Sequence, residues 1–536
     1  MLKKKRFLLL GVAFLAFSLL LVACGGDDTD VPMAGDDTDV PMADGGVGVT
    51  GASDEIIIGF GGEIPTLDPH AENLLAASQV FYHTANTLVN QNADLEIYPG
   101  LAHSWEQLDE LSWQFNLRDD VYFHNGDKMT AAHVEFSLTR AANAPSVEPV
   151  VGMINPDGFE VVDDYTIIIR TNYPFAPFLN HLAHNAALIL NKNVLGDLAP
   201  GDALNEYIVT TGPYQILEHI PGDRFVMERW DDYHGDRPNM RLITYRIIPD
   251  AAARSIALET GEIDAMMAPL PTDIERLENH NDITVHYVVG LGVEYIILNN
   301  YHIPDVRVRQ AMNYAVNGPQ MVNVITQGTA VYASGFINNI TFGHNPNFVG
   351  FPYDVERARE LMIEAGFSGE ADAGDLSFVI YANSENAVRQ QSAVIVQNHL
   401  RQIGIDLEIR SPEFNAMMDL IRNRQIPMAT LGWGTVTGDA DYAMFPLFHS
   451  SAVSPSTNHA LLENAAIDVL IEQARSSTDP DERIALYWEA QDLIREAAPW
   501  ILVSNNVIRV PAQNNVAGLT VMAHQGHFFG NIYFTE

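Results

Sequence analysis

Histidines are the residues most able to do chemistry in this chain, which contains 18 of them. His181 and His184 are three residues apart in a predicted helix, and His524 and His527 repeat that spacing near the C-terminus. Neutral imidazoles at this spacing can share a metal ion. Neither pair has cysteines or clustered carboxylates beside it, so surface or capping roles are favoured. The sequence predicts no metal site and no cofactor.

Two carboxylates form a second candidate. Asp439 and Asp441 make an Asp-x-Asp pair of the kind that binds metals, but their Gly-rich surroundings favour a turn. The chain has no Gly-x-Ser-x-Gly elbow, no His-Glu-x-x-His, no phosphate loop and no Gly-x-Gly-x-x-Gly opening a helix. We therefore expect a protein that is not an enzyme.

The single cysteine, Cys24, follows a basic segment at residues 3–6 and an apolar run from Phe7 to Val22. Leu21-Val22-Ala23-Cys24 resembles a bacterial lipobox, in which cleavage after residue 23 leaves the cysteine to carry lipid. An ordinary signal peptide with an incidental cysteine is the alternative. The pattern predicts a signal peptide at 1–23 and an extracytoplasmic lipoprotein anchored to the cell membrane, in the periplasm if the cell is Gram-negative.

Composition narrows the possible partners. The 536 residues carry 29 Lys+Arg against 69 Asp+Glu, a net charge of −40 that repels phosphate backbones and excludes nucleic acid. A lone cysteine cannot form an internal disulfide. Residues 24–52 repeat a nine-residue Gly-, Asp- and Pro-rich unit and are predicted to be a disordered acidic tether.

Strand and helix patterns alternate after residue 52. A β-branched strand at residues 55–60 ends at Gly61 and Gly62, and amphipathic helices follow at 305–316, 355–365, 387–403 and 483–497. Asp305 is a predicted helix cap. Further strands are expected at 112–117, 166–170, 224–228, 242–248, 283–289, 295–298, 376–381, 501–510 and 527–534. The fold class is therefore α/β with mixed β-sheets.

Short motifs in a fixed order then suggest a family. They include TLDPH at 66–70, PGLAHSWE at 99–106, LRDDVYFHNG at 117–126, TGPY at 211–214, ARSIAL at 253–258, GEID at 261–264, DVRVRQA at 305–311 and QIGI at 402–405. Each is weak alone, but together they span residues 55–536. The chain resembles the family-5 extracellular solute-binding proteins, the peptide, nickel and oligosaccharide receptors of ABC importers.

This resemblance implies a two-lobed clamp of the type II periplasmic-binding-protein kind with an extra subdomain. Lobe 1 is expected at residues 53–290 together with 501–536, with the extra subdomain at 93–204. Lobe 2 is expected at 291–500. The chain would cross between the lobes twice, on strands, and act as a monomer that presents its solute to a membrane permease.

The resemblance also implies a ligand site. Dipeptide-binding members carry a carboxylate three residues after the tryptophan that matches Trp433, and this chain has Val436 there. Asp439 or Glu63 could replace that anion, although a turn-capping role for Asp439 is equally open. Arg389 is the nearest candidate for the carboxylate-binding arginine, with a solvated helix-surface arginine as its alternative. The candidate ligand-binding residues are Gly61, Gly62, Glu63, Arg389, Trp433, Gly434, Thr435, Val436, Asp439 and Tyr442.

The expected function is a receptor that delivers an oligopeptide or a similar small polar solute to an ABC importer. An oligosaccharide, an opine-like compound or a nickel chelate is the alternative ligand. A structural or signalling lipoprotein that has kept the fold is a third class, which solute-dependent closure would distinguish.

Overall fold

The computed structural model describes residues 53–535, except 65, 72–74, 201–208, 334 and 454–456. The predicted signal peptide, the tether and Cys24 lie outside the described residues. Residues Ala52–Glu536 make one unit with a mixed α/β architecture, as expected. No helix in the described ranges is both long enough and apolar enough to cross a membrane.

A large mixed sheet runs through this unit, and eleven described strands form it. Parallel pairs occur on both sides of the central strands β12 and β17: β14 pairs with β15 and β16, and β1 pairs with β10 and β11. The strands in spatial order are β15 (Ile405–Arg410), β14 (Leu376–Tyr381), β16 (Met428–Gly434), β12 (Ile283–Leu298), β17 (Trp500–Gln513), β11 (Ala265–Met266), β1 (Glu55–Phe60), β10 (Leu242–Ile247), β9 (Arg224–Arg229) and β8 (Tyr214–Ile220), with β13 (Val331–Tyr332) beside β17.

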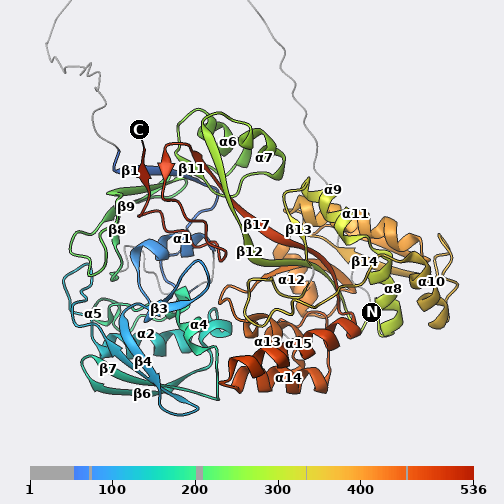
Figure 1. Ribbon diagram of the computed structural model, residues 1–536, viewed down its shortest axis with the longest axis horizontal. Helices are drawn as coiled ribbons and strands as arrows, with labels where there is room; N and C mark the ends of the chain where they lie inside the picture. Colours follow the sequence, from blue (N-terminus) through green and yellow to red (C-terminus); the bar gives the residue numbers. More distant parts are fainter. Residues whose placement is uncertain are drawn as a thin grey trace, which may run out of the picture. The chain divides into compact units, whose positions relative to one another are not determined.

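The long antiparallel strands β12 and β17 connect the two ends of this sheet (Figure 1). Residues 283–289 of β12 pair with 507–513 of β17, and residues 293–297 pair with 500–505. The register shifts between these two stretches. Residues 290–292, which include Gly290 and Gly292, form an irregularity there, and β12 continues beyond it. The predicted strands at 283–289 and 295–298 are therefore one element. The predicted lobe boundaries fall at this irregularity and at the start of β17, and they stay a prediction.

Helices cover the sheet at both ends. Aspartates cap several of them, and Asp305 accepts a hydrogen bond from the Arg307 N–H as predicted. The helices are α1 (Leu75–Thr84), α6 (Ala251–Glu259), α7 (Pro271–Glu278), α8 (Val306–Ala315), α9 (Gly318–Thr326), α10 (Val355–Glu364), α11 (Ala387–Arg401), α12 (Phe414–Arg422), α13 (Asp441–Phe448), α14 (Ala465–Ser476) and α15 (Pro480–Ala497), with a 3₁₀ turn at Ser450–Ala452.

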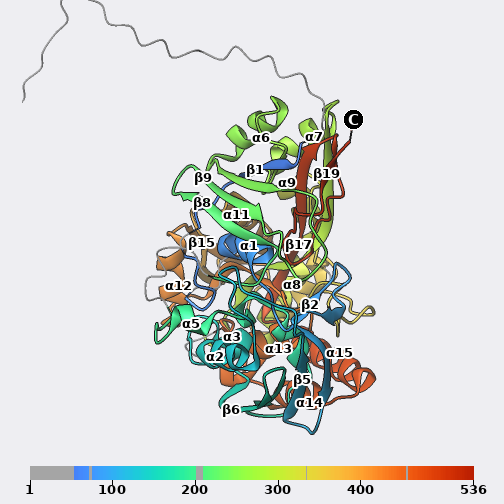
Figure 2. The ribbon, with the colours of Figure 1, turned by 90° about the vertical axis from the view of Figure 1, so that its left-hand side faces the viewer.

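A separate four-stranded sheet has its own core. It has the order β4 (Ala102–Gln107), β5 (Ser112–Leu117), β7 (Thr166–Thr171), β6 (Ile154–Asp163), and α2 (Ala131–Ala142) packs against β6 (Figure 2). Phe115 of β5 is fully buried in this core together with Phe123 and Phe178. Short elements complete this region: β2 (Val89–Gln91), β3 (Ile97–Pro99), α3 (Glu148–Val151), α4 (Phe178–Leu182), η1 (Asn185–Ala187) and α5 (Lys192–Leu195).

The C-terminal segment differs from its prediction. The strand expected at 527–534 is limited to β19 (Tyr533–Phe534), which pairs with β18 (Val516–Ala517). The residues before it are held by side chains instead, because the Phe529 N–H donates to His83 Nε2 and Phe529 is fully buried. The aromatic residues that suggested a strand therefore pack as a loop.

Candidate functional site

The loop after β16 begins in a strand and ends at α13. Gly434 is the Cα partner of Gly292 in β12, and the Trp433 Nε1–H donates to the Tyr442 carbonyl oxygen at 2.9 Å. The Trp433 ring lies 5.5 Å from the Tyr442 ring and contacts the apolar clusters on both sides of the loop. Trp433 and Tyr442 thus fix the shape of the loop, and neither lines a cavity described below.

Distant segments also contact this loop. The Thr435 N–H donates to the Leu291 carbonyl oxygen, and Thr435 is buried. Gln91 Nε2 and Asn180 Nδ2 both donate to the Thr437 carbonyl oxygen, at 3.0 and 3.2 Å. The loop is therefore joined by hydrogen bonds to β2 and α4, which come from the first half of the chain.

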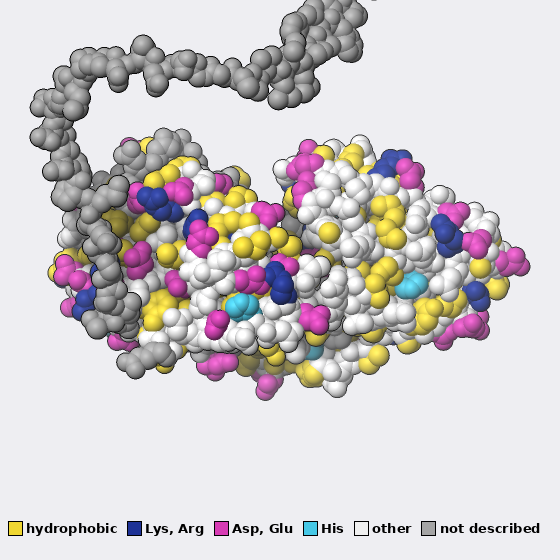
Figure 3. Space-filling model, turned by 90° about the horizontal axis from the view of Figure 1, so that it is seen from above, with side chains coloured by type: hydrophobic (Ala, Val, Ile, Leu, Met, Phe, Trp, Pro, Cys, Tyr) yellow, Lys and Arg dark blue, Asp and Glu magenta, His cyan; other side chains and the backbone are white. Residues whose placement is uncertain are grey.

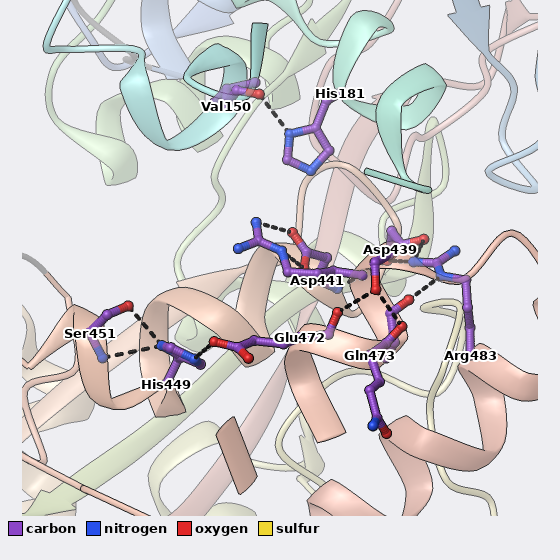
Figure 4. Close-up of polar contacts among 12 residues, drawn as sticks. Val150, His181, Asp439, Asp441, His449, Ser451, Glu472, Gln473 and Arg483 are labelled. Carbon is purple, nitrogen blue, oxygen red and sulfur yellow. Dashed lines mark hydrogen bonds and ion pairs between the residues drawn. The ribbon is translucent and has the colours of Figure 1, made fainter. Parts of the chain in front are cut away.

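Asp439 lies inside this loop and is bound by an arginine. Its carboxylate oxygens accept two bonds from Arg483 Nη2 in α15, at 2.8 and 2.9 Å, and both side chains are buried (Figure 4). Asp439 Oδ1 also accepts the Asp441 N–H, which is a turn-capping bond. With its charge compensated by Arg483, Asp439 is poorly placed to supply a free anion to a solute.

The Asp-x-Asp pair is divided between two arginines. Asp441 pairs with Arg475 at 3.1 Å, while Asp439 pairs with Arg483. Over the described residues, no group of three His, Cys, Asp or Glu side chains is arranged to hold a metal ion.

Arg389 lies in the first turn of α11, where Asn386 caps its N–H. Its guanidinium makes a two-point ion pair with Glu294 of β12, at 2.7 and 3.0 Å. Burial alone would lower the pKa of Arg389, but the Glu294 carboxylate raises that pKa above its usual value. Its side chain is 16% exposed, so the arginine faces the sheet rather than solvent.

Gly61 and Gly62 line a cavity of about 590 Å³, together with Glu294, Asn386 and Asn506. A Cβ on Gly61 would lie 2.5 Å from Arg254 Nη1, so a larger residue would displace this arginine. Arg254 is held in place because it donates to the carbonyl oxygens of residues 248, 249 and 268.

Glu63 is positioned elsewhere. Its side chain is exposed, and Oε2 accepts the Gly222 N–H in the turn between β8 and β9 at 3.3 Å. It contacts neither Val436 nor Asp439 and lines none of the cavities described here.

Val436 lines a second cavity, of about 490 Å³, bordered by β2, α4, η1 and the segment 518–531. Segment 524–527 lines this cavity and the cavity at Gly61, so the two lie on either side of it. A third space of about 500 Å³ adjoins Asp439 and Arg483. Sequence reasoning missed the amides Asn90, Gln91, Asn180 and Asn185 in the cavity at Val436. The run Asn90-Gln91-Asn92 was the available signal.

The histidine pairs do not have the geometry of shared metal ligands. His181 lies in α4, but that helix ends at Leu182 and His184 caps η1 instead, which corrects the predicted helix. His181 Nδ1 bonds the Val150 carbonyl oxygen at 2.6 Å, so its proton is on Nδ1 (Figure 4). His184 Nδ1 accepts the Ala186 N–H, which leaves the proton on Nε2. The two rings are therefore opposite tautomers.

The second pair has a related difficulty. His524 Nδ1 accepts the Gly526 N–H and His527 Nδ1 accepts the Met522 N–H, so both rings carry their proton on Nε2. A ligating histidine normally donates its other ring N–H to an acceptor, and here that nitrogen faces a donor. This arrangement supports the structural interpretation of His524 and His527.

Comparisons with known proteins now decide the family. The model of the bacterial extracellular solute-binding proteins, family 5 Middle, matches residues 96–455. The chain belongs to family 5 of the bacterial extracellular solute-binding proteins. The dipeptide-binding protein of Escherichia coli (strain K12) is 28% identical over 461 residues, which cover 82% of this chain and 86% of that protein.

Two solved structures are similar to this chain over nine-tenths of its length. DppA, an ABC transporter-associated periplasmic binding protein of Helicobacter pylori in complex with the peptide STSA, is 27% identical with a TM-score of 0.77, over 90% of this chain and 99% of that one. NikA from Brucella suis in complex with Fe(III)-EDTA is 26% identical with a TM-score of 0.81, over 90% and 100%. The Escherichia coli and Helicobacter pylori relatives are named as binding proteins rather than enzymes, the second of them as ABC transporter-associated.

Proposed function

We propose that this chain is the solute receptor of an ABC importer and that it captures an oligopeptide or a similar small polar solute. The observation that carries the proposal is the pair of cavities beside segment 524–527, one lined by Gly61 and Gly62 and the other by Val436. Their volumes, about 490 and 590 Å³, suit a small solute. One relative is named as a dipeptide-binding protein, and another was solved in complex with the peptide STSA, which supports a peptide ligand.

In this proposal the chain works as a two-lobed clamp whose lobes are residues 53–290 with 501–536, and residues 291–500. The extra subdomain comprises residues 93–204, and β12 and β17 form the two crossings. Bonds from Gln91 and Asn180 to the Thr437 carbonyl oxygen would form on closure, because they join the first lobe to the second. The closed monomer would then dock on the permease.

The test is a thermal-shift screen of the purified protein against di- to hexapeptides, oligosaccharides, opines and nickel chelates. A solute that binds the folded state alone raises stability by about 2.7 kcal/mol at a hundred times its Kd. A peptide hit supports the proposal. A higher melting temperature with oligosaccharides, opines or chelates alone would support the receptor function but contradict the peptide ligand. A melting temperature that no solute changes would count against a receptor function.

We also propose that lipid on Cys24 anchors the protein to the outer side of the cell membrane. The sequence Leu21-Val22-Ala23-Cys24 supports it. Expressed in a bacterium, the native protein should partition into detergent in a Triton X-114 separation, whereas Cys24→Ala should remain in the aqueous phase. If the two proteins partition equally, the proposed lipid anchor is wrong, and the proposed receptor function is not affected.

A further inference from the structure

The cavity at Val436 has a composition that restricts the chemistry of its occupant. Its 25 lining residues come from α1 and the residues after it, from β2 and β3, from α4 and η1 with their neighbours, from segment 213–236, from segment 518–531 and from Val436 itself. Across the whole chain 18% of residues are charged, so a lining of this size would include four or five. Among the described lining residues, Asp236 is the one Asp, Glu, Lys or Arg, and it is exposed.

The two histidines of the lining are also uncharged. His184 Nδ1 accepts the Ala186 N–H at 3.1 Å, and His524 Nδ1 accepts the Gly526 N–H at 3.0 Å. A protonated imidazole would place an N–H against an N–H at either site. Burial lowers the pKa of His184 to about 3 and that of His524 to about 4, so both are neutral at physiological pH.

Carboxamides supply the polar groups in place of charges. Gln91 and Asn180 each donate to the Thr437 carbonyl oxygen, and no described residue donates to Gln91 Oε1 or Asn180 Oδ1. Asn185 is 6% exposed, and its side chain hydrogen-bonds the hydroxyl of Tyr82, which also lines the cavity. The lining therefore offers carboxamide oxygens, on Gln91 and Asn180, that accept no hydrogen bond from the described chain.

Aromatic and apolar groups complete the wall. Tyr82 stacks on His524 with their ring centroids 5.2 Å apart, and Tyr233 lies near Asn86, which donates to its hydroxyl at 3.5 Å. Val436 contributes an aliphatic side chain that packs on the neighbouring core. Neutral carboxamides beside aromatic rings can bond hydroxyl or amide groups while they cover apolar surface.

A charged group would be poorly stabilised in this cavity. An ammonium or carboxylate that enters it loses hydration; no described lining residue is a Lys or Arg that could pair a carboxylate, and the one lining carboxylate, Asp236, is exposed to water and pairs an ammonium weakly. A hydroxyl or an amide exchanges its bonds to water for bonds to carboxamides, at a small net change in free energy. The difference favours an uncharged group in the cavity.

We propose that the cavity at Val436 takes an uncharged, hydrogen-bonding solute, such as a neutral oligosaccharide or a peptide segment without a free terminus. This inference rests on the proposed receptor function and names the chemistry of its solute. It predicts that the protein discriminates against a free ammonium or carboxylate placed beside Val436.

Titration calorimetry on the purified protein tests this with two sets of probes. The first set pairs dialanine and trialanine with their N-acetyl, C-amide forms, which share a backbone but lack the charges. The second contains cellotriose, maltotriose and xylotriose. We expect an uncharged probe to bind at least about tenfold more tightly than free trialanine, a difference of about 1.4 kcal/mol.

Two matched variants locate the effect. Val436→Asp introduces an anion, so we expect it to weaken binding of the uncharged probe. We expect the same variant to bind alaninamide about tenfold more tightly than the native protein does, because the new carboxylate can pair with the ammonium of alaninamide. Val436→Asn has nearly the same size without the charge and should leave alaninamide unchanged. A melting temperature for each variant separates loss of binding from loss of folding.

Each failure has a distinct meaning. If free peptides bind as tightly as their blocked forms, the proposal that the solute is uncharged is wrong, while the receptor function is supported. An unchanged preference in folded Val436→Asp would overturn the assignment to this cavity. No binding by any free, blocked or sugar probe, together with a negative thermal-shift screen, would overturn the receptor function and this inference with it.

Discussion

At the scale of single residues, the Asp439–Arg483 pair shows how a candidate binding group can serve the fold. Both side chains are buried, and the carboxylate is satisfied by two arginine bonds and a backbone N–H (Figure 4). Removing one partner of a buried pair leaves the other charge without compensation, which typically costs about 3–5 kcal/mol. We expect Asp439→Asn to lower the free energy of unfolding by that amount, measured by urea denaturation.

A surface pair gives the matched control. Arg118 and Asp120 lie 2.7 Å apart with their side chains 33% and 56% exposed. Asp120→Asn should change the free energy of unfolding by no more than about 1 kcal/mol. Equal losses in the two variants would mean that burial does not set the strength of these pairs.

His83 gives a prediction about pH. Its Nδ1 bonds the Gln79 carbonyl oxygen at 2.8 Å and its Nε2 accepts the Phe529 N–H at 3.0 Å, so the folded ring is held neutral. Burial lowers the pKa of His83 to about 4, below the usual value of 6.5. Because the unfolded chain binds this proton first, stability should fall as pH drops from 6.5 to 4, by about 3 kcal/mol for this group.

The measurement is the urea midpoint of unfolding at pH 7.5 and at pH 4.5. His83→Gln should show a smaller loss between the two pH values than the native protein, whatever its stability at pH 7.5. His103→Gln, at an exposed position, should keep the native loss. A His83→Gln variant with the full native loss would show that other groups account for the acid sensitivity.

At the scale of elements, the irregularity in β12 depends on a glycine. The Gly292 N–H donates to Asn506 Oδ1 at 2.8 Å, and a Cβ on Gly292 would lie 2.7 Å from that same atom. We expect Gly292→Ala to displace Asn506, break this bond and reduce the free energy of unfolding by about 1–3 kcal/mol.

Its partner across the ladder is the control. Gly434 pairs with Gly292, but the nearest atom to its added Cβ is Val436 Cγ1 at 3.6 Å, an ordinary contact. Gly434→Ala should therefore be neutral or slightly stabilising, since it restricts the unfolded chain. Chemical denaturation of both variants measures the difference, and a loss as large in Gly434→Ala would contradict the steric argument.

Elements were predicted from the sequence more completely than the site. Residues 112–117, 224–228 and 376–381 carry β-branched or alternating patterns that local chemistry alone converts into strands, and these strands are present. The continuity of β12 across residues 290–292 was missed because the two glycines suggest a break, whereas pairing with β17 on both sides of them holds the strand together. Likewise, nothing local to Asp439 or Arg389 indicates that Arg483 and Glu294 neutralise them, since these partners are 44 and 95 residues away.

Val436 could be singled out from the sequence because its family resemblance fixes its position in the loop. The amides that share its cavity could not be. Asn90 and Gln91 lie in a short strand, whereas Asn180 and Asn185 follow almost a hundred residues later, and the fold alone brings them together. A cavity is formed by the tertiary structure, so the charged groups and hydrogen-bond donors that line it can be identified only once the fold is known.

At the scale of the whole molecule, electrostatic repulsion opposes many local ion pairs. The chain has 69 carboxylates and 29 lysines and arginines, and acidic side chains are spread over the face in Figure 3, with cations lying beside some of them. Exposed pairs such as Arg170 with Glu160 contribute about 0–1 kcal/mol each, and salt weakens them. The carboxylates in excess of the cations repel one another across the folded molecule, and salt weakens this repulsion as well.

The excess charge decides which effect of salt is larger. The screening length falls from about 30 Å at 0.01 M to about 10 Å at 0.1 M, so long-range repulsion between like charges is lost before short pair contacts are. We therefore expect the melting temperature to rise between 0.01 and 0.2 M NaCl by about 2–4 °C, which corresponds to about 2–4 kcal/mol for a chain of this size, at an unfolding entropy of about 2.1 cal/mol/K per residue. KCl should act equally if screening is the cause, whereas sucrose matched in osmolality should give a smaller rise. A melting temperature that falls with salt would mean that the paired arginines outweigh the repulsion among the unpaired carboxylates.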